Sequence, residues 1–256
     1  MRLVPAIAIA VTAVARVAAA EPDDIIGRPL VLEQGQLDAR LAVETNLSTN
    51  LFARPLSFAP DVWYGVMPDV TIGLIHSDLA IDRLAPGASV CIRTDQIICP
   101  HTYHGSGLDM LVSLATGSFA AAAHVRMLVR DIDPYFEPAG TFGATLRWRR
   151  GRFAIAGDPY LQIGFDNNRH GNRTALWLPI TLSVQPLPRW AIDLYTGWNS
   201  DVAIIRDGYY VPAGVGTRVR ATDHIDVGAT FGFMSVLGPQ NDVKARVLFL
   251  TVGWRS

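Results

Sequence analysis

The sequence predicts an all-β fold, an antiparallel up-and-down β-barrel that crosses a membrane. Three observations predict it: segments of about ten residues alternate apolar and polar side chains, every second connection is short, and aromatic residues gather at the segment ends. Composition agrees, because 50% of the residues are hydrophobic, only 18% are charged, and 22 Gly and 16 Pro supply turn residues. The length of 256 residues suits one barrel.

The N-terminus has the pattern of an export signal. Arg2 supplies a positive charge, residues 3–14 form an apolar run, and residues 18–20 are all Ala, as at a signal cleavage site. An uncleaved amphipathic anchor is the alternative, although the apolar run is short for spanning a bilayer. We expect residues 1–20 to be removed, residues 21–35 to form an N-terminal periplasmic segment, and residues 36–256 to form the barrel.

About twelve strand candidates follow, and single-chain bacterial barrels have an even number of strands. Asp158-Pro159 interrupts the seventh, where we expect a bulge or fraying because Pro has no N–H to donate. In order, the candidates are Leu37–Ser48, Ser57–Val66, Val70–Ser77, Leu108–Ala115, Phe119–Arg130, Thr141–Arg149, Arg152–Phe165, Thr174–Gln185, Trp190–Trp198, Tyr209–Arg220, Ile225–Met234 and Ala245–Trp254.

The connections between these candidates alternate in length. Those after the second, fourth, sixth, eighth and tenth strands are tight: MPD, TGS, RG, PLPR and TDH. Those after the odd strands are longer, the longest being residues 78–107. A soluble sandwich has no reason to keep every second connection short. An outer-membrane barrel has short periplasmic turns, long extracellular loops, and both termini on the periplasmic side.

Side chains in the strands alternate between two faces. Alternation alone does not separate a barrel from a soluble two-sheet core. The predicted outward residues are Leu41, Val43, Ile72, Leu74, Val112, Leu114, Val125, Val129, Leu146, Ile180, Leu182, Ile192, Val215, Val227, Leu248 and Leu250, and the opposite face carries Arg40, Glu44, Arg126, Thr145, Arg147, Thr181, Ser183, Asp193, Arg218 and Asp226.

The aromatic residues favour a membrane over a soluble core. They share the outward face and gather at the strand ends, whereas a soluble core would place them at strand centres. Two aromatic girdles, one at each membrane interface, explain this distribution. The girdle near the short turns would contain Tyr64, Trp148, Trp190 and Trp254, and the girdle near the long loops would contain Phe58, Phe142, Phe165, Trp198 and Phe233.

The hairpin WYGVMPDVTIGL, Trp63 to Leu74, has an aromatic-Gly strand end, a Met-Pro-Asp turn and an alternating strand. From about Gln34 onward, the chain resembles the small outer-membrane β-barrel proteins of Gram-negative bacteria, the broad group of porins and outer-membrane transporters. The resemblance implies contact with outer-membrane lipid and, during biogenesis, with the barrel-assembly machinery. Such proteins typically end on an aromatic residue, whereas here Trp254 stands before Arg255 and Ser256.

Two cysteines stand in the longest connection. Cys91 and Cys99 predict a local disulfide, because an exported chain meets an oxidising compartment. His101 and His104 follow Cys99, so a metal site is the alternative, but the set makes a poor zinc site and we expect no metal. The formal net charge of −1 suggests no nucleic-acid partner, and no motif indicates a cofactor.

One pair of residues has the spacing of a hydrolase. His104 and Ser106 stand two apart at a strand start, and outer-membrane lipid hydrolases use a His-x-Ser pair of this kind. Those enzymes usually continue with Asn after the Ser, whereas here Gly107 follows, and a third member is missing. A Gly-rich loop entering a strand is the interpretation that we favour.

Charged residues on the inward face would line the lumen near the short turns. They predict either ion pairs that fill the interior or, with arginines in excess, a slight preference for anions. These residues are Arg40, Arg147, Arg149, Arg218, Arg220, Asp38, Asp193 and Asp226.

The leading functional hypothesis is a narrow pore or small-solute transporter without enzymatic activity. A closed structural barrel, a membrane-embedded lipid acyl hydrolase and a secreted soluble β-sandwich or lipocalin-like binder are the alternatives. The oligomeric state and the solute stay open.

Overall fold

The computed structural model describes residues 24–48, 52–54, 56–76, 90–93, 101–133, 135–170, 172–239 and 242–256. The predicted signal at residues 1–20 therefore lies outside the described residues. The elements are β1 (Leu37–Asn46), β2 (Leu56–Met67), β3 (Val70–Ile75), β4 (Val90–Arg93), β5 (Ser106–Ala115), β6 (Phe119–Val129), β7 (Pro138–Arg150), β8 (Phe153–Gly157), β9 (Tyr160–Gly164), η1 (Asn168–His170), β10 (Ala175–Leu187), β11 (Trp190–Asp201), η2 (Val202–Ile204), β12 (Tyr209–Arg220), β13 (Ile225–Leu237) and β14 (Asp242–Arg255).

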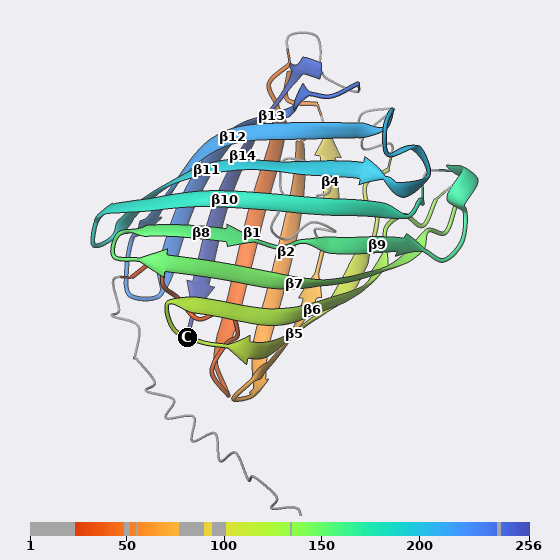
Figure 1. Ribbon diagram of the computed structural model, residues 1–256. Coiled ribbons are helices and arrows are strands. Elements are labelled where there is room, and N and C mark those ends of the chain that lie inside the picture. The colour runs from red at the N-terminus through yellow and green to blue at the C-terminus, as the bar shows by residue number, and fades with distance from the viewer. Residues whose placement is uncertain are drawn as a thin grey trace, which may run out of the picture.

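The strands close into an antiparallel barrel (Figure 1). Around the wall the order is β1-β14-β13-β12-β11-β10-β8-β7-β6-β5-β3-β2, and β1 pairs with both β14 and β2. This closure leaves no free edge in the wall. β9 continues β8 between β7 and β10, and the additional strand β4 pairs with β2. The predicted barrel of about twelve strands is confirmed, whereas β4 was not predicted.

Short turns join every second pair of strands, as predicted. They connect β2 to β3, β5 to β6, β7 to β8, β10 to β11, and β12 to β13. Gly117 and Gly151 take positive φ angles of 107° and 58° in two of these turns, a conformation that costs glycine little. The start of β1 pairs with the end of β14, so the C-terminus lies at the short-turn end (Figure 1).

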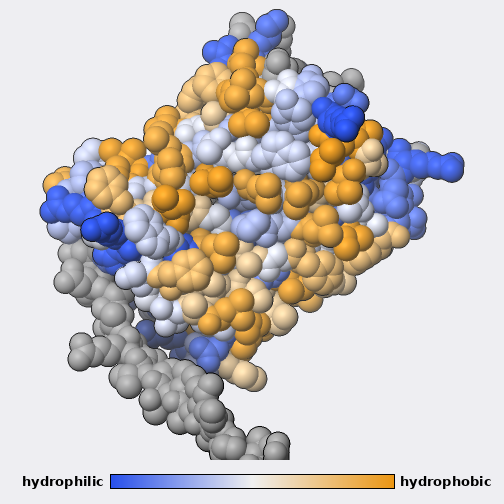
Figure 2. All heavy atoms as spheres, viewed as in Figure 1, coloured by the Kyte–Doolittle hydropathy of each residue, from blue (hydrophilic) through white to orange (hydrophobic). Residues whose placement is uncertain are grey.

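The outer surface of the barrel is apolar. In β3, for example, Ile72 and Leu74 are exposed, whereas Thr71 and Ile75 are buried. Figure 2 shows hydrophobic side chains spread over the middle of one side, with hydrophilic residues toward both ends. A soluble monomer rarely exposes so much contiguous apolar surface, so the outer face suits lipid. Within the described residues, no helix is long and apolar enough to cross a membrane.

The predicted interruption of the seventh strand is confirmed. β8 ends at Gly157 and β9 begins at Tyr160, so Asp158 and Pro159 stand between them. The side-chain alternation continues across the break, because Ala154, Asp158 and Tyr160 are all buried. The break therefore leaves Asp158 on the inward face.

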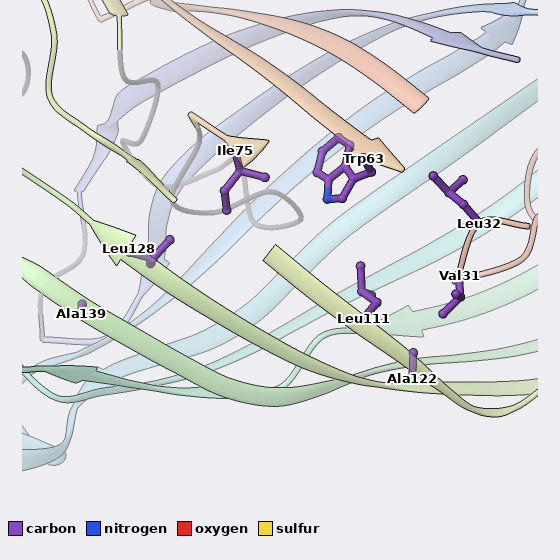
Figure 3. Close-up of a cluster of buried hydrophobic side chains, with 8 residues drawn as sticks. All are labelled: Val31, Leu32, Trp63, Ile75, Leu111, Ala122, Leu128 and Ala139. Carbon is purple, nitrogen blue, oxygen red and sulfur yellow. The ribbon is translucent and has the colours of Figure 1, made fainter. Parts of the chain in front are cut away.

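The barrel interior near the short turns is packed. One buried cluster joins Val31 and Leu32, which precede β1, to Trp63, Leu111 and Ala122 in the wall (Figure 3). A second joins Ile25 and Ile26 to the small wall residues Ala154 and Ala191. Small side chains on the wall leave room for Ile25, Ile26, Val31 and Leu32, which are buried in the interior.

Candidate functional site

The candidate site is the barrel interior, because the charged residues of the wall gather there. Inward-facing positions alternate with the lipid-facing ones along each strand, so a charged residue at an inward position avoids lipid. Among the described residues, the buried charged ones are Asp24, Asp38, Glu44, Asp61, Asp109, His124, Arg126, Arg147, Asp158 and Asp193.

A group that we call the central cluster consists of Asp109, His124, Arg126, Thr145 and Asp158. The imidazole of His124 bridges two carboxylates: Nε2 lies 2.6 Å from Asp109 Oδ1, and Nδ1 lies 2.7 Å from Asp158 Oδ1. Arg126 Nη2 donates to Asp158 Oδ2 at 2.7 Å, and Thr145 Oγ1 donates to Asp158 Oδ1 at 2.6 Å. Buried charges persist where they are paired in this way.

Aromatic residues complete the surroundings of the central cluster. Trp63 Nε1 donates to Asp109 Oδ2 at 2.7 Å, and the Arg126 guanidinium lies 5.0 Å from the centre of the Tyr160 ring. Cation and acid partners thus come from adjacent wall strands, and the strand break supplies the second acid. This arrangement braces one side of the wall.

A second ion pair joins the wall strands β11 and β12. Arg218 of β12 makes a two-pronged contact with Asp193 of β11, with Nε to Oδ2 at 2.7 Å and Nη2 to Oδ1 at 2.8 Å. Ser183 Oγ donates to the same carboxylate at 2.6 Å. Asp193 has no exposed surface, whereas the side chain of Arg218 is 39% exposed.

A third ion group repeats this arrangement on β1. Asp38 accepts hydrogen bonds from both Arg40 and Arg255, with Arg40 Nε 3.0 Å and Arg255 Nε 2.9 Å from the carboxylate. The side chain of Asp38 is 6% exposed and that of Arg40 is 44% exposed, although Arg40 occupies an inward position. In both groups the carboxylate is therefore covered, whereas the arginine side chain stays partly accessible.

The other predicted lumen charges contact the chain ends or the turns. Arg147 donates to the carbonyl oxygen of Arg28, and Arg149 pairs with Asp24. Asp226 pairs with Arg28, whose Nη2 lies 2.8 Å from Asp226 Oδ1. Arg220 of β12 donates to backbone carbonyls of the turn that follows it. The predicted charges thus form several ion pairs with different partners.

The predicted girdle residues lie on the outer face. Near the short turns, Tyr64, Trp148, Trp190 and Trp254 are all exposed. Toward the loops, Phe142 and Phe165 are exposed, and Phe58, Trp198 and Phe233 are partly buried. Their association with membrane interfaces stays a prediction.

The remaining predicted residues lie in the long connection between β3 and β5, with Ser106 as the first residue of β5. His104 Nδ1 lies 3.2 Å from Asp131 Oδ2, whereas His104 Nε2 is buried and, among the described residues, has no hydrogen-bond partner, Ser106 included. Within the part of the chain that the structure describes, no His, Cys, Asp and Glu side chains form a group able to hold a metal. Cys91 is buried in β4, but Cys99 lies outside the described residues, so the disulfide stays a prediction.

Comparison with known proteins gives the fold and no closer relationship. No family model matches the sequence, and no curated protein matches it. The solved structure of the KdgM porin in complex with disordered oligogalacturonate is similar, with a TM-score of 0.56 and 8% identity over 86% of this chain and 98% of that one. The chain has the fold of an outer-membrane β-barrel.

Two further structures agree with this barrel. An outer membrane channel from Pseudomonas putida F1 has a TM-score of 0.54 and 12% identity over 88% of this chain and 97% of that one. The NanC porin has a TM-score of 0.53 and 8% identity over 86% and 98% of the two chains. Identities this low leave the solute to be argued from the interior itself.

Sequence reasoning missed three of the five residues of the central cluster. Arg126 and Thr145 were expected on the inward face, but Asp109, His124 and Asp158 were not singled out. His124 stands two residues before Arg126 in β6, so the same alternation places it inside. The other missed feature is the N-terminal segment in the interior, for which the sequence before β1 carries no strand signal.

Proposed function

We propose that this protein is a narrow outer-membrane pore or small-solute transporter that favours anions. The observation that carries the proposal is the exposure of Arg40 and Arg218. Both occupy inward positions, yet their side chains are 44% and 39% exposed. A barrel filled throughout by side chains would bury them, so this exposure supports a solvent-filled space inside.

The preference for anions follows from which charges face that space. A guanidinium stays charged at any accessible pH, and those of Arg40 and Arg218 lie in front of the covered carboxylates of Asp38 and Asp193. A nearby permeating ion is therefore closer to the positive charges. Rings or patches of arginine in a pore favour anions in this way.

The proposal includes a location and a route to it. An export signal cleaved after residue 20, insertion by the barrel-assembly machinery of a Gram-negative bacterium and contact with outer-membrane lipid are all expected of such a pore. Detergent should be needed to release the protein from the outer-membrane fraction. Its recovery in the soluble periplasm would support the alternative of a soluble binder.

Conductance tests the function itself. The purified protein, folded in detergent and inserted into a planar lipid bilayer, should produce discrete current steps. Folding is checked by electrophoresis of boiled and unboiled samples, since folded and unfolded barrels migrate differently. Folded protein that inserts and never conducts, in any of the variants described below, would support a closed structural barrel.

A further inference from the structure

Residues 24–36, which we call the N-terminal strap, lie inside the short-turn end of the barrel. The side chains that bond their backbone stand near short turns. Gln185 Oε1, close to the end of β10, accepts hydrogen bonds from the backbone N–H groups of Ile25 and Ile26 at 2.9 and 3.2 Å. Thr71 Oγ1, near the start of β3, accepts from Leu32 N at 2.8 Å.

The strap crosses the lumen from wall to wall. The side chain of Arg28 pairs with Asp226 on β13, while its carbonyl oxygen accepts from Arg147 on β7. Around the barrel, β13 and β7 are five strand places apart in one direction and seven in the other, so they are almost opposite. One strap residue therefore joins two facing walls.

Apolar contacts, and a close backbone approach at a glycine, pack the strap against the wall. Val31 and Leu32 lie beside Trp63, Leu111 and Ala122 in the interior (Figure 3). At Gly65 of β2, Gly35 N donates to the Gly65 carbonyl at 2.8 Å, and Gly65 N donates to the Gln36 carbonyl at 2.9 Å. A Cβ atom at Gly65 would overlap the backbone carbonyl of Glu33, so the strap lies here only because the residue is glycine.

From this geometry we infer that the strap is a plug that narrows the short-turn mouth of the pore; the inference rests on the proposed function. The strap is not itself a strand of the wall, although its last residues exchange two backbone hydrogen bonds with Gly65 of β2. Its charged contacts are partly exposed: the Arg28 and Asp226 side chains are 20% and 29% exposed. Arg40 lies in the same row of the wall as Asp226, because both pair with Gly253. Ions that pass the strap therefore pass close to Arg40.

Four variants of the full-length protein test the plug in planar bilayers. Gly65→Ala should push the strap off β2 and raise the single-channel conductance by about twofold or more, with a weaker anion preference. Gly253→Ala is the matched control: it is also an inward-facing glycine, but a Cβ there meets only ordinary contacts, so the conductance should stay at the wild-type value. Arg28→Asp should act like Gly65→Ala through repulsion from Asp226, and Arg28→Asp/Asp226→Arg should restore the low conductance.

The outcomes separate the two proposals. Gly65→Ala and Arg28→Asp barrels that fold and conduct like wild type would overturn the plug and leave the pore intact. If no variant conducts, the proposed function itself fails. If Arg28→Asp does not fold, the conductance of Gly65→Ala compared with that of Gly253→Ala still tests the plug, because neither substitution changes a charge.

Discussion

At the residue scale, His124 shows how the wall tolerates buried charge. Its two ring nitrogens each contact a carboxylate, so it holds Asp109 and Asp158 together, with the Arg126 guanidinium bound to Asp158 beside it. Removing one member of a buried charged group costs more than the group contributes as a whole, because its partners stay buried without compensation.

His124→Ala should therefore lower the free energy of unfolding by about 3–5 kcal/mol. Two carboxylates would then share one guanidinium in a place that water barely reaches. Urea unfolding in detergent micelles or lipid vesicles measures the loss. The control is Val125→Ala on the adjacent lipid-facing position, and a His124→Ala loss no larger than that of the control would show that the cluster does not brace the wall.

The same scale shows what sequence patterns predict. The face of each residue was predictable, because side chains alternate with a period of two along a strand. The partner of each charged side chain was not predictable, because it depends on how the strands close into a barrel. Arg149 was expected to face the acids of the lumen, yet its partner is Asp24 of the strap. Nothing in the spacing of two residues so far apart in the chain indicates such a contact.

At the element scale, the longest connection holds the predicted disulfide. Cys91 lies in β4, which pairs with β2 and was too short and too close to Pro and Gly residues to be predicted as a strand. Labelling of free thiols in denatured, unreduced protein should detect none, and reduction should cost about 2–3 kcal/mol at most. Two labelled thiols per chain would show that the cysteines are not bridged.

Strand β12 provides a matched test of lipid contact. Val215 and Val219 both face outward, but Val215 lies at the middle of the strand and Val219 near its short-turn end. Val215→Arg should cost about 2–4 kcal/mol in a bilayer, and Val219→Arg about 0–1 kcal/mol, because the penalty for a lipid-facing charge falls toward the interface.

Unfolding of the two variants in lipid vesicles measures the difference. If both substitutions cost little, the outer face of β12 does not lie in a membrane, and a soluble barrel with an apolar surface would have to be considered again.

At the scale of the whole molecule, strand order and connection length were predictable from the sequence, because each short turn forces neighbouring strands together. The position of the strap in the interior was not predictable from the sequence. The strap reaches the wall through single hydrogen bonds, ion pairs and a glycine contact, and none of these produces a periodic pattern. The account of the pore therefore depends on which charges the strap and the wall leave accessible.

The reversal potential across a salt gradient tests this account most directly. In a KCl gradient, the wild-type pore should show the sign of an anion preference, weakening as salt screens the mouth. Arg218→Gln/Asp193→Asn removes one charge of each sign and keeps polar groups of similar shape. We expect its reversal potential to move toward cations, because the lost arginine faces the lumen and the lost carboxylate is covered. An unchanged reversal potential in this conducting variant would contradict the account, since the ion pairs would then only brace the wall.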